Sequence, residues 1–172
     1  MSLLPGILVF LVALGGMEAV AFLTHRYIMH GPMWRWHRSH HEPRTGWFEL
    51  NDLFAVVFAG VAIGLFLLGT RPGLGLFTWA AAGVTAYGGL YALVHDGLVH
   101  RRFPMVKARR GYLLRLVQAH HLHHLAHEKV GAVSFGFLLP QDPEKLARRL
   151  ADLRRNGHSG AARVSPPPTS GS

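Results

Sequence analysis

Three long apolar stretches constrain the fold of this 172-residue chain more than any other feature. They run from Leu3 to Leu23, from Leu53 to Leu68 and from Leu74 to Val94. A helix needs about 20 apolar residues to cross a bilayer core of about 30 Å; the second stretch, about 24 Å as a helix, is slightly short. Only 16% of the residues are charged, against roughly 25% in soluble domains. The sequence therefore predicts an all-α integral membrane protein with three or four membrane helices.

The positive charge of the chain predicts how it lies in the membrane. Arg71 is the only basic residue between the second and third stretches, and the other 17 of the 18 lysines and arginines follow the first or the third stretch. The positive-inside rule makes those regions cytoplasmic and puts the N-terminus on the opposite side. Because the basic residues lie between apolar stretches, we expect membrane lipid rather than nucleic acid as a partner. A fourth apolar piece, Gly131 to Pro140, is too short to span and is expected to be buried or interfacial.

Ten of the 13 histidines follow a spacing that occurs twice, H-x4-H and then H-x2-HH. They are His25, His30, His37, His40 and His41 in the first half, and His95, His100, His120, His123 and His124 in the second. Residues at i, i+3 and i+4 share a helix face, so the imidazoles of each H-x2-HH block are expected to converge. An i, i+5 pair lies about 140° apart on a straight α-helix. Such a pair requires a break in the helix or two separate metals.

This number of imidazoles predicts a site for two metal ions in a helical, histidine-rich cytoplasmic cap. One ion cannot bind ten of them, because zinc takes four ligands and octahedral metals take six. The chain has no cysteine, which excludes thiolate ligands, but imidazole suits iron, zinc, copper and nickel alike. The expected position, where membrane helices meet water, favours redox iron, with zinc as the alternative. A single histidine-rich tract is typical of an exposed surface segment, whereas four histidine blocks on one side of a membrane indicate a metal-binding site.

Three further residues are candidates for supporting the ligands. Glu18, inside the first stretch, could orient an imidazole, line a substrate tunnel or pair with a polar group on another span. Asp96 is expected to offset the charge of the metals, and His127 shares the ligand face of the fourth block. Asn51 and Asp52 are expected to cap the second membrane helix.

The C-terminal part divides into a helix and a tail. Residues 142–156 predict an amphipathic helix that lies either on anionic lipid headgroups or against the protein. Residues 158–172 are rich in glycine, serine and proline and predict a disordered tail. The sequence thus predicts one membrane domain, residues 1–157.

The histidine pattern and the sequence around it resemble the β-carotene hydroxylases of the membrane fatty-acid hydroxylase superfamily. The similar segments, from about Glu18 to Pro140, are "HRYIMHGPMWRWHRSHHEP", "GWFELNDLFAVVF", "HDGLVHRRFP", "RRGYLLRL", "AHHLHH" and "VSFGFL". The resemblance implies a non-haem di-iron monooxygenase, with the ten motif histidines as ligands of two iron ions. It also implies hydroxylation of carbon 3 of each β-ionone ring, from β-carotene through β-cryptoxanthin to zeaxanthin. The reaction would use O2 and electrons from a ferredoxin-type donor with its reductase.

Two alternatives remain open at this point. One is a fatty-acid or sterol hydroxylase or desaturase of the same superfamily, which shares the looser histidine pattern. The other is a histidine-rich membrane metal sensor or transporter, although transport favours polar positions inside the spans and these contain few. For a lipophilic substrate, the expected tunnel-lining residues are Phe22, Trp47, Phe54 and Phe135.

Overall fold

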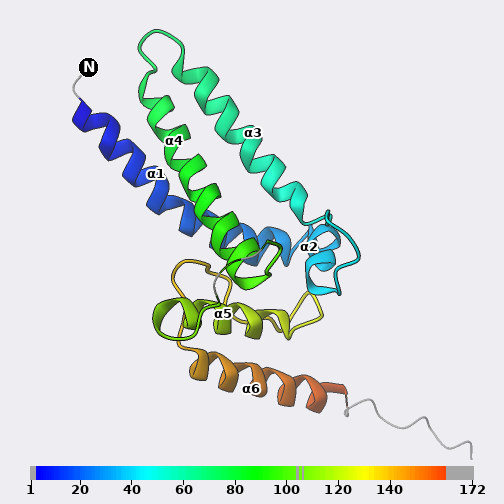
Figure 1. Cartoon of the computed structure of the whole chain (residues 1–172). Coiled ribbons are helices and arrows are strands. Elements are labelled where there is room, and N and C mark those ends of the chain that lie inside the picture. Colours follow the sequence, from blue (N-terminus) through cyan, green and yellow to red (C-terminus); the bar gives the residue numbers. More distant parts are fainter. Residues whose placement is uncertain (1–2, 104, 106, 162–172) are drawn as a thin grey trace, which may run out of the picture.

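The computed structural model describes residues 3–103, 105 and 107–161, and this part of the chain is helical without any strand (Figure 1). The elements in chain order are α1 (Leu3–Leu23), η1 (Thr24–Met29), α2 (Trp34–His41), α3 (Asp52–Gly69), α4 (Leu76–Tyr91), η2 (Ala92–Val99), α5 (Gly111–His124) and α6 (Pro143–Ala161). The two η elements are π-helical turns that continue α1 and α4 without interruption. The predicted all-α architecture is confirmed.

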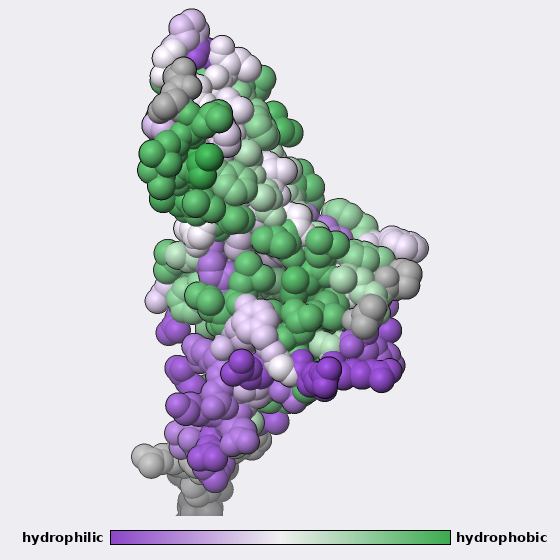
Figure 2. Space-filling model, turned by 60° about the vertical axis from the view of Figure 1, so that its left-hand side comes forward, coloured by the Kyte–Doolittle hydropathy of each residue, from purple (hydrophilic) through white to green (hydrophobic). Residues whose placement is uncertain are grey.

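Three of the helices are long and apolar enough to cross a membrane, as predicted. They cover Leu3–Met29, Asp52–Gly69 and Leu76–Val99. Figure 2 shows that apolar side chains cover the half of the molecule that these helices form, while polar side chains gather at the end of α5 and α6. The short apolar piece, residues 131–140, forms no helix, and Val133 and Phe137 within it are buried. Its middle is therefore buried, whereas Gly131 and Leu139 near its ends are exposed.

The central membrane helix is α4, because α1 and α3 each pack against it and hardly against each other (Figure 1). The packing of α1 on α4 depends on a close approach at Gly83. A Cβ atom on Gly83 would lie 2.6 Å from the carbonyl oxygen of Phe10 and 2.8 Å from Cβ of Ala13. Small residues at such crossings let membrane helices pack backbone against backbone.

This close approach predicts opposite effects for two glycine-to-alanine changes on α4. Gly83→Ala is expected to lower the free energy of unfolding by about 1–3 kcal/mol, because the new methyl group overpacks against a backbone that cannot easily move. Gly89→Ala, with nothing within 4 Å of its Cβ position, is expected to be neutral or to stabilise by up to about 1 kcal/mol, since alanine favours the helix. Thermal unfolding in detergent measures both, and equal shifts would contradict the packing described.

The C-terminal helix α6 packs on α5, at the end of the molecule away from the three spans (Figure 1). Leu146 and Leu150 of α6 are buried against Ala119 of α5 and against Val133. The predicted amphipathic helix therefore exists, and it packs against the protein through Leu146 and Leu150, while Leu153 remains exposed. It extends to Ala161, beyond the predicted end, and residues 162–172 of the predicted tail lie outside the described residues.

Candidate metal centre

Both H-x4-H pairs lie in π-helical turns, and this geometry differs from the straight helix considered from the sequence. The amide of His30 donates to the carbonyl of His25 at 3.0 Å, and that of His100 donates to His95 at 2.8 Å. These are i+5 to i hydrogen bonds, which define a π-turn. The wider turn carries an i, i+5 pair on one face, so the expected separation of about 140° on a straight helix does not apply here. The helix is widened rather than broken.

The ten predicted ligands gather in two adjoining groups. Four ligand nitrogens of His25, His30, His37 and His123 lie within 4.8 Å of one another, and so do four of His40, His95, His100 and His120. Nε2 of His41 lies 3.1 Å from Nε2 of His37, and Nε2 of His124 lies 2.9 Å from Nε2 of His120. We call these five-histidine sets the first group (His25, His30, His37, His41, His123) and the second group (His40, His95, His100, His120, His124).

Each H-x2-HH block divides between the two groups, which corrects the expectation that its three imidazoles converge on one place. His37 and His41, at i and i+4, belong to the first group, whereas His40 belongs to the second. In α5 the arrangement is reciprocal, because His123 crosses to the first group. The groups touch where the rings of His41 and His124 stack with their centroids 4.6 Å apart. Both groups thus need both halves of the chain.

Six of these imidazoles have their protonation fixed by an oxygen acceptor at Nδ1. The pairs are His25 with the Phe135 carbonyl (3.0 Å), His30 with the Lys129 carbonyl (3.0 Å), His37 with Oδ1 of Asn51 (2.8 Å), His40 with Oε2 of Glu49 (3.0 Å), His95 with Oδ1 of Asp96 (2.7 Å) and His123 with the Val133 carbonyl (2.9 Å). Carbonyl and carboxylate oxygens only accept, so Nδ1 carries the hydrogen. In a neutral ring, Nε2 then presents a bare lone pair, the usual state of a metal-binding histidine.

These six lone pairs face one another in three pairs. The Nε2 atoms are 3.1 Å apart in His25 and His37, 3.2 Å in His30 and His123, and 3.0 Å in His40 and His95. Burial lowers the pKa of His37, His40 and His123 below the ordinary value and keeps these rings neutral. Two neutral rings with lone pairs face to face have no proton to share and repel. A cation between them removes that repulsion, so both groups are suited to hold a metal ion.

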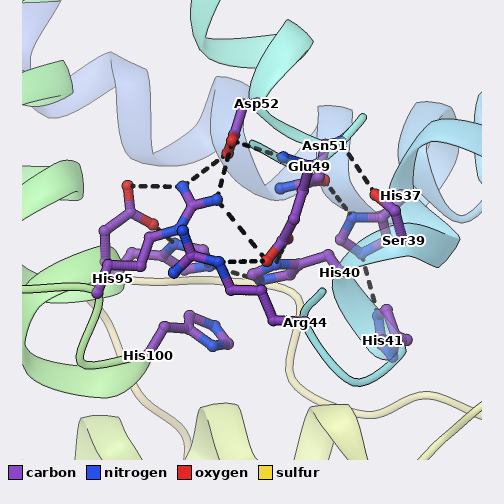
Figure 3. Close-up of polar contacts among 12 residues, drawn as sticks. His37, Ser39, His40, His41, Arg44, Glu49, Asn51, Asp52, His95 and His100 are labelled. Atoms are coloured by element: carbon purple, nitrogen blue, oxygen red, sulfur yellow. Dashed lines mark hydrogen bonds and ion pairs between the residues drawn. The ribbon is translucent and has the colours of Figure 1, made fainter. Parts of the chain in front are cut away.

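An arginine links the carboxylates behind the second group. Arg102 donates to both oxygens of Asp52, at 2.7 and 2.8 Å, and its guanidinium lies 3.7 Å from Glu49 and 3.6 Å from Asp96. Figure 3 shows Glu49 beside His40 and Asp52 above them, on the side of α3. Two of the three carboxylates accept hydrogen bonds from His40 and His95. Arg102 therefore helps to hold the residues that orient these two rings.

The side chain of Asn51 corrects another expectation. It occupies the N-cap position of α3 but makes no capping hydrogen bond. Its Oδ1 instead accepts from Nδ1 of His37 (Figure 3), and its backbone amide donates to the hydroxyl of Ser39 at 3.1 Å. Asn51 thus belongs to the histidine site.

An apolar cavity of about 520 Å³ lies between α1, α3 and α4 and ends at the histidines. His25, His95 and His120 form part of its wall, so both groups are reached from it. Of the four predicted tunnel residues, Phe54 and Phe135 line the cavity. Phe22 packs edge-to-face on Phe135, with centroids 6.4 Å apart, and does not line it. Trp47 is 85% exposed and lies outside it.

The comparison with known proteins agrees with this geometry. The family model for fatty acid hydroxylases matches residues 10–141. This chain belongs to the fatty acid hydroxylase family. A protein named beta-carotene hydroxylase from Pseudescherichia vulneris is 56% identical over 140 residues, which cover 81% of this chain and 79% of that protein. Another of that name, from Pantoea ananas, is 52% identical over 157 residues, 91% of this chain and 89% of its own length.

A plant relative extends the same similarity. The Arabidopsis thaliana protein named beta-carotene 3-hydroxylase 1, chloroplastic, is 42% identical over 165 residues, which cover 87% of this chain and 53% of that protein. No solved structure matches the chain significantly. The resemblance seen in the histidine motifs is therefore confirmed at the level of the family.

In this member of the fatty acid hydroxylase family, the three residues that were predicted to support the ligands differ in what they contact. Asp96 accepts from His95, as its position next to that ligand suggested. Glu18 touches none of the ten histidines through a described hydrogen bond; it accepts from the hydroxyl of Tyr87 at 2.7 Å, so it pairs with a polar group on another span. His127 is exposed and belongs to neither group.

Glu18 also fixes the segment that holds two histidines. One of its oxygens accepts from the backbone amides of Phe137 and Leu138, at 2.8 and 2.9 Å, and more weakly from the next amide. A few residues earlier, the carbonyls of Val133 and Phe135 accept from His123 and His25. Glu18 therefore positions these two rings indirectly, through the segment of residues 131–140.

Glu18→Gln tests this indirect role. The change keeps the size of the side chain but removes the charge that strengthens its hydrogen bonds to the amides, each worth about 1.5–3 kcal/mol when one partner is charged. We expect a lower unfolding temperature in detergent and weaker retention of metal. The matched control is Glu128→Gln, at an exposed position, which should behave as the wild type. Unchanged stability and metal content in the Glu18 variant would contradict a positioning role.

Proposed function

We propose that this protein is a carotenoid ring hydroxylase that converts β-carotene through β-cryptoxanthin to zeaxanthin by hydroxylating carbon 3 of each β-ionone ring. The observation that carries the proposal is the paired arrangement of Nε2 lone pairs at the end of an apolar cavity. Membership of the fatty acid hydroxylase family and the names of the relatives support the same reaction. The substrate implied by this cavity is lipophilic.

We further propose that the first and second groups each hold one iron ion. Neighbouring Nε2 atoms within each group lie 2.9–3.2 Å apart, so the imidazoles of each group could hold one ion between them. Bound iron would supply the activation of O2, because no side chain can deprotonate an unactivated ring carbon.

The protein's own residues would bind the metal ions, orient the imidazole rings and shield the substrate ring from water. The oxygen acceptors at Nδ1 keep the rings in one tautomer and aim their Nε2 atoms, which saves reorganisation when metal binds. Asp96 and Glu49 add negative charge beside neutral ligands, which offsets the charge of a cation in a buried site. Phe54 and Phe135 line the approach to the histidines and exclude water from the ring that is to react.

The orientation and the electron supply are part of the proposal. All but one of the 18 basic residues lie in the regions that follow the first and third spans, which supports a cytoplasmic histidine site and an N-terminus on the other side. Electrons would then come from a soluble ferredoxin-type donor with its reductase. Residues 1–157 would act as one membrane domain.

Expression in cells that accumulate β-carotene tests the function. Pigment chromatography should show β-cryptoxanthin and zeaxanthin, and the purified protein should retain about two iron ions per chain. Hydroxylated fatty acids or sterols without any change in pigment would support the other substrate classes of the superfamily. Loosely exchangeable zinc without an oxidised product would support a metal transporter.

A further inference from the structure

The cavity is long and follows one face of α3. Phe54, Phe58, Ala62 and Phe66 all line it, at intervals of four residues along the helix. Phe66 lies twelve residues beyond Phe54, about 18 Å along the helix. The cavity thus runs along most of α3, and only one end of it reaches the histidines.

One long side of this cavity is open at the level of the membrane. Its walls come from α1, α3 and α4, but α1 and α3 pack on α4 and hardly on each other (Figure 1). Ala55, Ala59 and Ile63 line the cavity and are nevertheless exposed, and Ile63 has 59% of its surface free. These residues form a rim along α3, so the gap between α1 and α3 faces the hydrocarbon of the bilayer.

The outer part of the cavity offers no free hydrogen-bond donor among its described lining residues. Four hydroxyl-bearing residues line the cavity, and two of them lie at the histidine end, where Thr24 precedes His25 and Tyr91 stacks on His95. The two in the outer part are already engaged, since Thr85 donates to the carbonyl of Ala81 at 2.8 Å and Tyr87 donates to Glu18 at 2.7 Å. Charged lining residues occur only at the histidine end, where Asp52 and Asp96 lie. A ligand of this outer part must therefore be hydrocarbon along its length.

We infer that the cavity is a slot that admits a long, rigid hydrocarbon sideways from the bilayer, through the gap between α1 and α3. The hydrocarbon lies lengthwise along α3, and only its terminal ring reaches His25, His95 and His120. This inference rests on the proposed function and deepens it, because it assigns the slot to the polyene chain and the histidine end to the ring. Small residues on the slot wall, above all Ala62, set the room for the chain.

The test places a plug in the slot at a known distance from the histidines. Ala62 is eight residues, about 12 Å, beyond Phe54 along α3, so Ala62→Phe leaves the ring end open and fills the space for the chain. We expect β-carotene turnover to fall at least tenfold, while β-ionone, which has the same ring and a short tail, is hydroxylated within about twofold of wild type. Ala59→Phe at the exposed rim should lower kcat/KM for β-carotene with less risk to folding. The control is Val57→Phe on the same helix, at a position 53% exposed and outside the slot, which should change neither substrate.

A binding measurement separates this inference from the proposed function. Full-length protein is purified in detergent from β-carotene-accumulating cells, and the pigment bound per chain is read from its absorbance. Wild type and Val57→Phe should retain β-carotene and both plug variants should lose it, even if wild type forms no zeaxanthin. Normal β-carotene binding and turnover in both plug variants would overturn the slot, and so would an equal loss of β-carotene and β-ionone turnover in both of them.

Discussion

His123→Ala is expected to abolish hydroxylation and to remove about one of the two iron ions that we propose each chain binds, while the protein still inserts into the membrane. His123 is completely buried; its Nδ1 donates to the Val133 carbonyl and its Nε2 faces that of His30. The variant removes one ligand of the first group and leaves a cavity that no other imidazole can fill. Activity should fall below about one-hundredth of wild type, since loss of even an indirect partner of a metal ligand costs about 10- to 100-fold.

Two companion variants make the result specific. His40→Ala, in the second group, should also abolish activity. His121→Ala, an exposed neighbour in the same helix and in neither group, should retain both iron and turnover. Pigment chromatography, iron analysis of the purified protein and the amount in the membrane fraction are compared for all three. Near-normal zeaxanthin formation by His40→Ala or His123→Ala would exclude that residue as a ligand.

The membrane helices could be predicted because one physical requirement decides them. A backbone in hydrocarbon must satisfy its own hydrogen bonds, so a long apolar stretch has few alternatives to a helix. The predicted stretches Leu3 to Leu23 and Leu53 to Leu68 agree closely with α1 and α3. The third, Leu74 to Val94, ends inside a π-helical turn, because apolar character marks a helix but not the type of its turns.

The pairing of the histidines was harder to predict, because it depends on the arrangement of helices in space. Spacing alone singled out the ten histidines that the structure brings together, but neighbouring residues such as His40 and His41 point about 100° apart on a helix. They therefore reach different groups, and the sequence does not say which. The π-turns at His25 and His95 were also missed, since i+5 hydrogen bonds leave no compositional signal beyond the H-x4-H spacing itself.

Half of the oxygen acceptors at Nδ1 could not have been found from residue types. Three of them are backbone carbonyls, of Lys129, Val133 and Phe135, and every residue has one. The positions of the Val133 and Phe135 carbonyls depend on how the segment of residues 131–140 folds against Glu18, which lies more than 100 residues earlier in the chain. Glu49 and Arg102 carry charges within or beside the motifs, and these two could have been suspected as partners of the ligands.

Arg102→Gln is expected to lower hydroxylation by about 10- to 100-fold, the usual cost of disturbing the partners of metal ligands. The change removes the guanidinium group that binds both oxygens of Asp52. The carboxylates of Asp52, Glu49 and Asp96 then lie near one another without the cation that they share. We also expect a loss of roughly 2–3 kcal/mol in stability, below the 3–5 kcal/mol of a fully buried pair, since Arg102 and Asp52 are 14% and 21% exposed. Repulsion among the carboxylates should tilt the rings of His40 and His95, which hydrogen-bond to two of them.

A positioning role and a purely structural role predict different results for the protein that remains folded. If Arg102 positions the ligands, the folded Arg102→Gln protein should release iron to a chelator faster than wild type, and Arg102→Lys should be intermediate, because lysine keeps the charge but not the two-pronged geometry. Arg101→Gln, at the exposed neighbouring position, is the control and should match wild type. A purely structural role would lower the unfolding temperature and leave iron release and turnover per folded chain unchanged. That outcome would mean that Arg102 does not help to orient the rings of His40 and His95. The orientation of these rings would then depend on Glu49 and Asp96 alone.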